Sequence, residues 1–238
     1  MDQRVAVLAP EAATPSGRLD PAPPYPGPVP PDELLDVIEP DGTPIGRRTR
    51  WEVHAEGLWH QVFHCLIVRS GEPARVLLQQ RHRDLRSFGG KLDLSATGHL
   101  SAGEDVLEGV REVAEELGIE VDPARLVPLG ARLLVDDGGE GRNRERVHAF
   151  LLADDRPLAD FAPDPAAVEA LVELDVAELL AIVGDPGAVA AGTRWAPGRD
   201  PVEVPVTADD LVPAVDGYWV VLAVMADRFA RGLRPLAI

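Results

Sequence analysis

A glycine-containing turn that leads into a short amphipathic helix is the feature that most constrains the fold. The stretch GHLSAGEDVLEGVREVAEELGI runs from Gly98 to Ile119. From about Leu107 to Leu117, apolar residues recur at three- and four-residue spacings, which predicts a helix with one buried face. Gly118 follows as a residue suited to end that helix. The chain must therefore contain a core on which this helix packs.

Three glutamates share the other face of this predicted helix. Glu112, Glu115 and Glu116 stand at i, i+3 and i+4, so their side chains project together. Like charges at this spacing cost roughly 0.2 to 0.5 kcal/mol per pair. A solvated surface face is one explanation, and a bound divalent cation is the other. Oxygen ligands favour Mg²⁺ or Mn²⁺ over zinc, and such an ion stabilises charge on a diphosphate and lowers the pKa of a bound water.

The rest of the chain alternates between strand and helix patterns. Residues 33–54 predict a hairpin around PDGTP, residues 164–183 predict two helices around a short strand or turn, and residues 184–205 look irregular. A final helix is expected within 212–233, with Pro213 near its start and Gly232 at its end. Its apolar stripe consists of Val215, Trp219, Leu222, Met225 and Phe229. Strands are expected at 60–68, 74–81, 93–100, 126–135 and 146–153. This mixture favours a helix–sheet–helix sandwich of the α+β or α/β class.

Composition sets the broad class and the boundaries. Nine of the 23 prolines lie in residues 1–31, which we expect to be a flexible tail; residues 32–183 would form the main domain and residues 184–238 a C-terminal extension. The net charge of −17 disfavours nucleic acid and anionic membrane surfaces as partners. No apolar run approaches the roughly 18 to 20 residues that span a bilayer, so we expect a cytoplasmic protein. The single cysteine, Cys65, excludes an internal disulfide and a cysteine zinc site.

The stretch from Gly98 to Ile119 resembles the Nudix box, whose pattern is G-x5-E-x7-R-E-U-x-E-E-x-G-U with U an aliphatic residue. Nine positions match in identity: Gly98, Glu104, Arg111, Glu112, Val113, Glu115, Glu116, Gly118 and Ile119. Six residues, DVLEGV, separate Glu104 from Arg111, where the family has seven. Residues 33 to about 183 resemble the Nudix subgroup that includes isopentenyl diphosphate isomerase. The resemblance implies the Nudix sandwich with a mixed sheet, and makes a homodimer plausible.

The same resemblance implies roles for the box residues. Glu112, Glu115 and Glu116, with the backbone carbonyl of Gly98, would hold Mg²⁺ or Mn²⁺. Glu112 would serve as a ligand or as the base that orients water. Arg111 would be a structural partner and Glu104 a supporting carboxylate. The implied reaction is hydrolysis of a diphosphate linkage in a small nucleoside diphosphate derivative or related diphosphate.

An isomerase is the alternative enzyme within this resemblance. That enzyme uses a cysteine just before the Gly-His of its box region, where this chain has Thr97. Without a thiol there, allylic proton transfer lacks one of its two acid–base groups, so the hydrolase is favoured. The isomerase also binds a metal through histidines and glutamates. The similar positions here are His54, His60, His99 and Glu145, with Asn143 in place of an acidic ligand.

Each of these candidate functional residues could instead have a purely structural role. His99 is a candidate for substrate binding and Glu145 a candidate catalytic base, although each could be a hydrogen-bonded structural residue. A cationic cluster before the box could hold the substrate's phosphates, or could be a solvated loop; it consists of Arg81, His82, Arg83, Arg86 and Lys91, of which Arg81, Arg83 and Lys91 are the candidates for substrate binding. The GGK in this segment is not a P-loop, because a leucine follows the lysine. A module that binds a nucleotide without cleaving it remains the non-enzymatic alternative.

Overall fold

The computed structural model describes residues 33–136, 142–214 and 216–238. The predicted proline-rich tail and part of the polar loop after residue 136 lie outside these ranges. The strands are β1 Leu34–Ile38, β2 Pro44–Thr49, β3 Trp59–Arg69, β4 Arg75–Arg81, β5 Leu92–Asp93, β6 Ala96–His99, β7 Val127–Asp136, β8 Asn143–Ala153, β9 Val168–Asp175, β10 Ala190–Trp195 and β11 Val202–Val206. The helices are α1 Arg50–Glu56, α2 Arg111–Leu117, α3 Val176–Gly184 and α4 Tyr218–Ala230. The 3₁₀ turns in these ranges are η1 Glu108–Val110, η2 Pro123–Arg125, η3 Leu158–Asp160 and η4 Ala208–Asp210.

Within the described residues, the main sheet has nine strands, in the order β11-β10-β9-β4-β3-β8-β7, with β5 beside β4 and β6 beside β3. Strands β3 and β8 are parallel, and the other pairs in this sheet are antiparallel. The predicted mixed sheet is therefore confirmed. Strands β6 and β4 share one edge of β3, because β6 pairs with residues 62–65 and β4 with residues 67–69.

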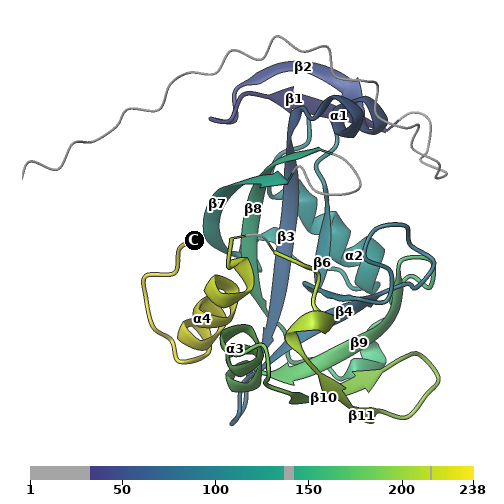
Figure 1. Cartoon of the computed structure of the whole chain (residues 1–238), viewed down its shortest axis with the longest axis vertical. Helices are drawn as coiled ribbons and strands as arrows, with labels where there is room; N and C mark the ends of the chain where they lie inside the picture. The colour runs from purple at the N-terminus through teal and green to yellow at the C-terminus, as the bar shows by residue number, and fades with distance from the viewer. Residues whose placement is uncertain (1–32, 137–141, 215) are drawn as a thin grey trace, which may run out of the picture.

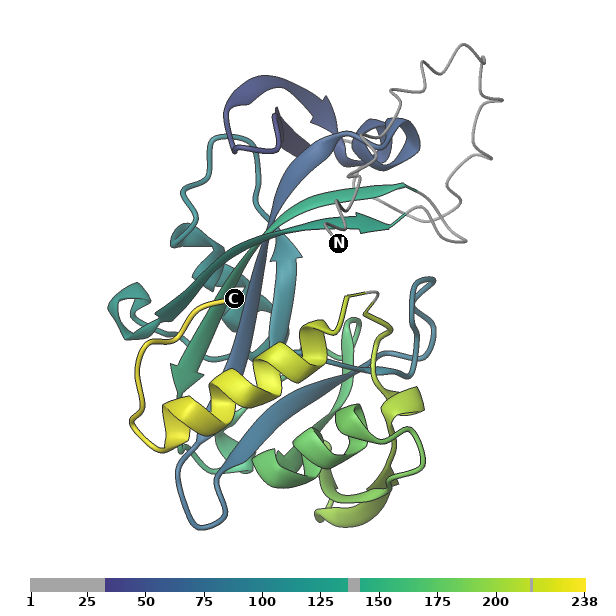
Figure 2. The same ribbon diagram turned by 60° about the vertical axis from the view of Figure 1, so that its left-hand side comes forward.

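The side chains of β3 alternate between two cores. Leu66 and Val68 join a cluster that includes α3 and α4, whereas Phe63 and Cys65 join a cluster that includes α2. Figures 1 and 2 show α3 and α4 on one side of the sheet, with α4 lying across the strands. The predicted helix–sheet–helix sandwich is the observed architecture.

The hairpin near the start of the described chain is confirmed, but its predicted end is not. Strands β1 and β2 form a separate two-stranded sheet whose turn contains Gly42 at φ 97°. The chain then becomes helix α1 where a continued strand was expected. Thr49 begins this helix with a capping box: its side chain accepts from the Glu52 backbone N–H, and Glu52 accepts from the Thr49 backbone. Helix α1 thereby carries His54 to the end of the main sheet.

The helix predicted over 107–117 is confirmed, and its first turn is the 3₁₀ turn η1. Val113 and Leu117, on the inner face of α2, are fully buried. Gly118 ends the helix in the left-handed conformation, at φ 67°. A Cβ at Gly118 would also lie 2.3 Å from the Ala162 carbonyl oxygen, so glycine is required there twice over.

Two predictions for the C-terminal third are wrong. The first helix expected within 164–183 is strand β9, because this segment pairs with β4 on one side and β10 on the other. The irregular segment 184–205 contains β10 and most of β11. At Gly192 a Cβ would lie 2.9 Å from Val206 and 3.0 Å from Val172, so the glycine admits close side chains from both neighbouring strands.

The terminal helix is confirmed, but it begins later than predicted. Gly217 precedes α4 at φ 71°, so the helix begins at Tyr218 and not near Pro213. Val215, the first residue of the predicted stripe, lies outside the described residues. Trp219 and Leu222 are buried in the core shared with α3, and Met225 and Phe229 pack partly buried against it.

Candidate active site

A cavity of about 390 Å³ opens between α2, β6 and the α1 end of the molecule. It is lined by Glu33, Arg50, Val62, His64, Arg81, Leu85, Thr97, Gly98, His99, Arg111, Glu112, Glu115, Glu116, Glu145 and Ala167. These residues come from segments that are far apart in sequence. Eight of them were singled out by the sequence as site residues: Arg81, Gly98, His99, Arg111, Glu112, Glu115, Glu116 and Glu145.

Gly98 allows α2 to approach β6. A Cβ at this position would lie 2.0 Å from Cδ of Glu112, far closer than two atoms can pack. Glycine is therefore required for the Glu112 carboxylate to lie against the strand. The neighbouring residues of β6, Thr97 and His99, line the same cavity.

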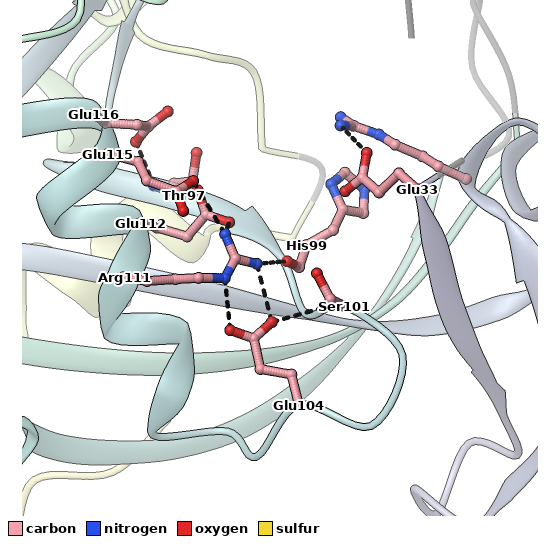
Figure 3. Close-up of polar contacts among 10 residues, drawn as sticks. Glu33, Thr97, His99, Ser101, Glu104, Arg111, Glu112, Glu115 and Glu116 are labelled. Atoms are coloured by element: carbon pink, nitrogen blue, oxygen red, sulfur yellow. Dashed lines mark hydrogen bonds and ion pairs between the residues drawn. The ribbon is translucent and has the colours of Figure 1, made fainter. Parts of the chain in front are cut away.

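Arg111 joins the carboxylates of the box. Its guanidinium donates to both oxygens of Glu104, at 2.6 and 2.9 Å, and to the His99 carbonyl at 2.8 Å. It also donates to Glu112 at 2.7 Å and to Glu115 at 3.1 Å (Figure 3). Glu108, one turn before Arg111, instead accepts from the Asp105 backbone N–H. The predicted structural contact of Arg111 with Glu104 is thus present in bidentate form.

Glu116 is held separately from Arg111. One of its carboxylate oxygens accepts from the Thr97 backbone N–H and from the Gln79 side chain, both at 2.9 Å. Gln79 is buried on β4 and was not singled out by the sequence. Side chains alternate along β4, and Gln79 is on the same face as Leu77, which packs against the core of α2. This alternation is the sequence signal that could have identified Gln79.

Burial raises the pKa of three carboxyl groups at the cavity. The pKa of Glu112 rises to about 7 although Arg111 opposes the shift. The pKa of Glu116 rises to about 8, again through burial, with the Thr97 N–H opposing it. The pKa of Glu145 rises to about 7, and the charge of Arg132 opposes that rise. Such values near neutrality suit groups that bind cations or move protons.

Three histidines meet beside the cavity, and one of them, His99, lines it. Among residues 33–136, 142–214 and 216–238, His54, His60 and His99 are the group whose ligand atoms all lie within 4.8 Å of one another, as a metal site requires. Nε2 of His54 lies 3.1 Å from Nε2 of His99. The rings of His60 and His99 stack, with centroids 5.1 Å apart.

Hydrogen bonds fix the orientation of two of these rings. Nδ1 of His54 lies 2.9 Å from the Asn143 side-chain oxygen, and Nδ1 of His60 lies 3.0 Å from the Leu58 carbonyl. Because both partners are acceptors, both Nδ1 atoms donate, and both Nε2 atoms keep a lone pair. Nε2 of His60 is buried without a hydrogen-bond partner, 4.0 Å from Glu145. Burial lowers the pKa of all three rings, that of His60 to about 4, so they are neutral near pH 7.

The predicted phosphate-binding cations lie in different surroundings. Arg81 lines the cavity and donates to the buried Asp93 carboxylate at 3.1 Å. Arg83 forms a bidentate ion pair with Glu169, and the Lys91 ammonium donates to the Asp209 carbonyl. Neither of these two lines the cavity, so the geometry supports phosphate binding for Arg81 and gives it no support for Arg83 or Lys91.

Thr97 and Cys65 are the two residues that decide whether a thiol is available for an isomerase reaction. Thr97 lines the cavity at the place of the isomerase cysteine. Cys65 is fully buried in the core beneath α2, and burial raises its pKa to about 12. Cys65 therefore cannot replace the missing thiol.

Comparisons with known proteins identify the family. A family model described as the NUDIX domain matches residues 58–191. A Nudix hydrolase from Clostridium acetobutylicum is 31% identical over 206 residues, which cover 83% of this chain and 99% of the relative. An isopentenyl-diphosphate Delta-isomerase from Burkholderia multivorans is 31% identical over 157 residues, which cover 65% of this chain and 84% of the relative. A crystal structure from Deinococcus radiodurans covers 66% of this chain and 92% of its own, with 21% identity and a TM-score of 0.49.

The domain and the relatives define a class of enzymes that hydrolyse diphosphate bonds. This chain belongs to the Nudix family, as a Nudix hydrolase. The family generally uses a divalent metal and acts on small-molecule diphosphates. In the part of the chain that the structure describes, no helix is long and apolar enough to cross a membrane.

Proposed function

We propose that this protein is an Mg²⁺- or Mn²⁺-dependent hydrolase that cleaves a diphosphate linkage in a small nucleoside diphosphate derivative or a related diphosphate. The observation that carries the proposal is the shared cavity, where Glu112, Glu115 and Glu116 face the cationic Arg81. Carboxylates can hold a hard cation against diphosphate oxygens, and an arginine can neutralise the remaining phosphate charge.

The fit of a cation rests on the donor set and on Gly98. Glu112, Glu115, Glu116 and the Gly98 carbonyl would hold it, and the missing Cβ at Gly98 leaves room for the Glu112 carboxylate. A divalent ion there would stabilise charge on the diphosphate and lower the pKa of a water. Arg111 positions Glu112 and Glu115, and Glu104 in turn holds Arg111.

Proton transfer falls to a carboxylate with a raised pKa. Glu145 lines the cavity outside the box, and its pKa of about 7 lets it accept a proton from the attacking water near neutral pH. Glu112, whose pKa is also raised to about 7, is the second candidate for the base. If Glu145 is the base, Glu112 serves as a cation ligand. Arg81, held by Asp93, binds the phosphates, and His99 contacts the substrate or a metal.

The histidine cluster supports a second metal as part of this site. Imidazole nitrogen favours Zn²⁺, Fe²⁺ or another transition ion over Mg²⁺. The lone pair of His60 Nε2, buried and without a partner, fits a ligand to such an ion. A relative named isopentenyl-diphosphate Delta-isomerase makes an isomerase the alternative function, and Thr97 in place of the thiol ranks it below hydrolysis.

We also propose a cytoplasmic location and a homodimer. The net charge of −17 supports a small-molecule substrate without a nucleic-acid or membrane partner. Size-exclusion chromatography with light scattering tests the dimer, which a monomeric mass at micromolar concentration would contradict.

Phosphate release, coupled to a pyrophosphatase or a phosphatase that frees phosphate from the products, is the test of the main proposal. Nucleoside di- and triphosphates, sugar nucleotides, dinucleoside polyphosphates and isoprenoid diphosphates are assayed with Mg²⁺, with Mn²⁺ and with EDTA. Metal-dependent release from one class is expected. Conversion of isopentenyl diphosphate to its isomer without release would replace hydrolysis by the isomerase, and nucleotide binding without turnover would favour the non-enzymatic module.

A further inference from the structure

His64 is a cavity-lining residue to which the proposed mechanism gives no task. It lies on β3, opposite Thr97 of β6 in the antiparallel register. Nδ1 of His64 lies 3.3 Å from the Tyr218 hydroxyl, and the two rings are tilted with centroids 5.8 Å apart. Tyr218 is the first residue of α4 and lies beyond the residues that match the Nudix domain. The C-terminal extension therefore reaches a residue of the cavity wall.

Arg132 on β7 fixes the other side of Tyr218. Its guanidinium carbon lies 4.1 Å from the centroid of the Tyr218 ring, in cation–π geometry. The same guanidinium forms an ion pair with Asp216, just before α4. A cation over the ring makes the phenol a better donor, so the Tyr218 hydroxyl is suited to donate to Nδ1 of His64. The Nε2–H of His64 is then its remaining polar group.

We propose that His64, oriented by Tyr218, is a neutral hydrogen-bonding subsite for the group that the substrate carries beyond its diphosphate. In this subsite His64 donates to an uncharged oxygen, such as a hydroxyl, ether or carbonyl oxygen. This inference rests on the proposed hydrolase, because it assigns one part of that enzyme's substrate to one wall of the same cavity.

Charge explains why the subsite accepts a neutral group. Burial lowers the pKa of His64 to about 3, and the nearby positive charge of Arg132 lowers it further. Two titratable groups on other elements also interact with His64: His99 on β6 and Tyr218 on α4. A second phosphate or carboxylate at this position would find no cationic imidazole. The anionic part of the substrate is therefore directed to Arg81 and the carboxylate-bound cation.

The test compares Tyr218→Phe with Trp219→Phe. The first removes the hydroxyl and keeps the ring, whereas the second removes another hydrogen bond of α4, from the Trp219 indole to the Val212 carbonyl at 2.7 Å. NMR of protein with ¹⁵N-labelled histidine reports the tautomer of each ring, and His64→Gln assigns the His64 signals. We expect the Nε2–H tautomer for His64, altered by Tyr218→Phe and unaltered by Trp219→Phe.

Kinetics supply the second readout. Inorganic pyrophosphate carries a diphosphate and no further group, so its inhibition constant should not change in Tyr218→Phe. The kcat/KM of substrates that carry a neutral oxygen should fall about twofold to tenfold, as expected for one neutral hydrogen bond. Equal losses for pyrophosphate and substrates, or equal effects of Trp219→Phe, would overturn the subsite.

A failure of the subsite can be separated from a failure of the hydrolase. If the coupled assay with wild-type protein releases no phosphate from any compound, the proposed function fails. The His64 signals then decide the subsite by themselves, in titrations with ADP-ribose and with inorganic pyrophosphate. A shift with ADP-ribose alone supports the subsite, and a shift with both or with neither contradicts it.

Discussion

The two sides of the cavity treat their charged and polar groups differently. On the α2 side, Arg111 and the Thr97 backbone N–H supply hydrogen-bond donors to Glu112, Glu115 and Glu116. Beside the cavity, His54, His60 and His99 bring ring nitrogens together, and among the described residues Nε2 of His60 has no hydrogen-bond partner. Arg111 thus stabilises the glutamates through hydrogen bonds, whereas burial lowers the pKa values of the histidines and Arg50, the cation near them, lowers these further through its charge. The glutamates can therefore keep their positions without a metal, whereas Nε2 of His60 is left buried without a partner.

The largest effect is expected from the carboxylate side. The double change Glu115→Gln and Glu116→Gln should lower kcat by more than about 100-fold, because it replaces two charged carboxylate ligands with neutral amides. The loss of a residue outside the ligand set usually costs less, ~10- to 100-fold. Phosphate release from the best substrate measures the loss. Glu120→Gln, an exposed residue just after α2 that does not line the cavity, is the matched control. Turnover that survives the double change would show that the reaction lies elsewhere.

The next effect concerns the histidine side. His60→Ala should lower the affinity for Co²⁺ or Zn²⁺ by at least about tenfold, because the ring offers a lone pair that no protein donor satisfies. Competition with a chromophoric chelator measures the affinity. His148→Ala is the control, since His148 bonds to Gln61 and stands apart from the cluster. Equal affinity in the wild type and His60→Ala would mean that the cluster holds no metal.

A smaller effect is expected on stability as a function of pH. The pKa of Glu116 is raised from 4.5 to about 8 in the folded protein, so the folded state binds the proton more tightly than the unfolded state. Its stabilising contribution is therefore complete below pH 4.5 and is lost as the pH rises to about 8. Glu116→Gln removes this dependence. Relative to wild type, the variant should gain roughly 1 to 3 kcal/mol in free energy of unfolding between pH 5 and pH 8.

Urea denaturation at several pH values, in EDTA, measures this difference. Glu120→Gln again serves as the control, because its carboxyl group is exposed at a position outside the cavity. A constant difference between Glu116→Gln and wild type across this pH range would show that burial does not control the ionisation of Glu116.

The carboxylate side could be predicted from the sequence to a much greater extent than the histidine side. Glu112, Glu115 and Glu116 lie within one helical turn, and local spacing is enough to place them together. His54, His60 and His99 come from α1, β3 and β6, so their meeting depends on the register of β6 against β3. No local spacing reports that register. The same limit explains β9, where pairing with two neighbouring strands overrides a segment that also suits a helix.

The smallest effect is expected at Thr97, which stands between the two sides. Thr97→Cys keeps a side chain of similar size, so hydrolysis should change by less than about threefold, within the range of a volume-conserving change. It would also place a thiol in the cavity, whereas Cys65 is fully buried. A thiol reagent should label the native variant once and the native wild type not at all. Labelling of the native wild type would show that Cys65 is accessible and able to serve as an acid–base group.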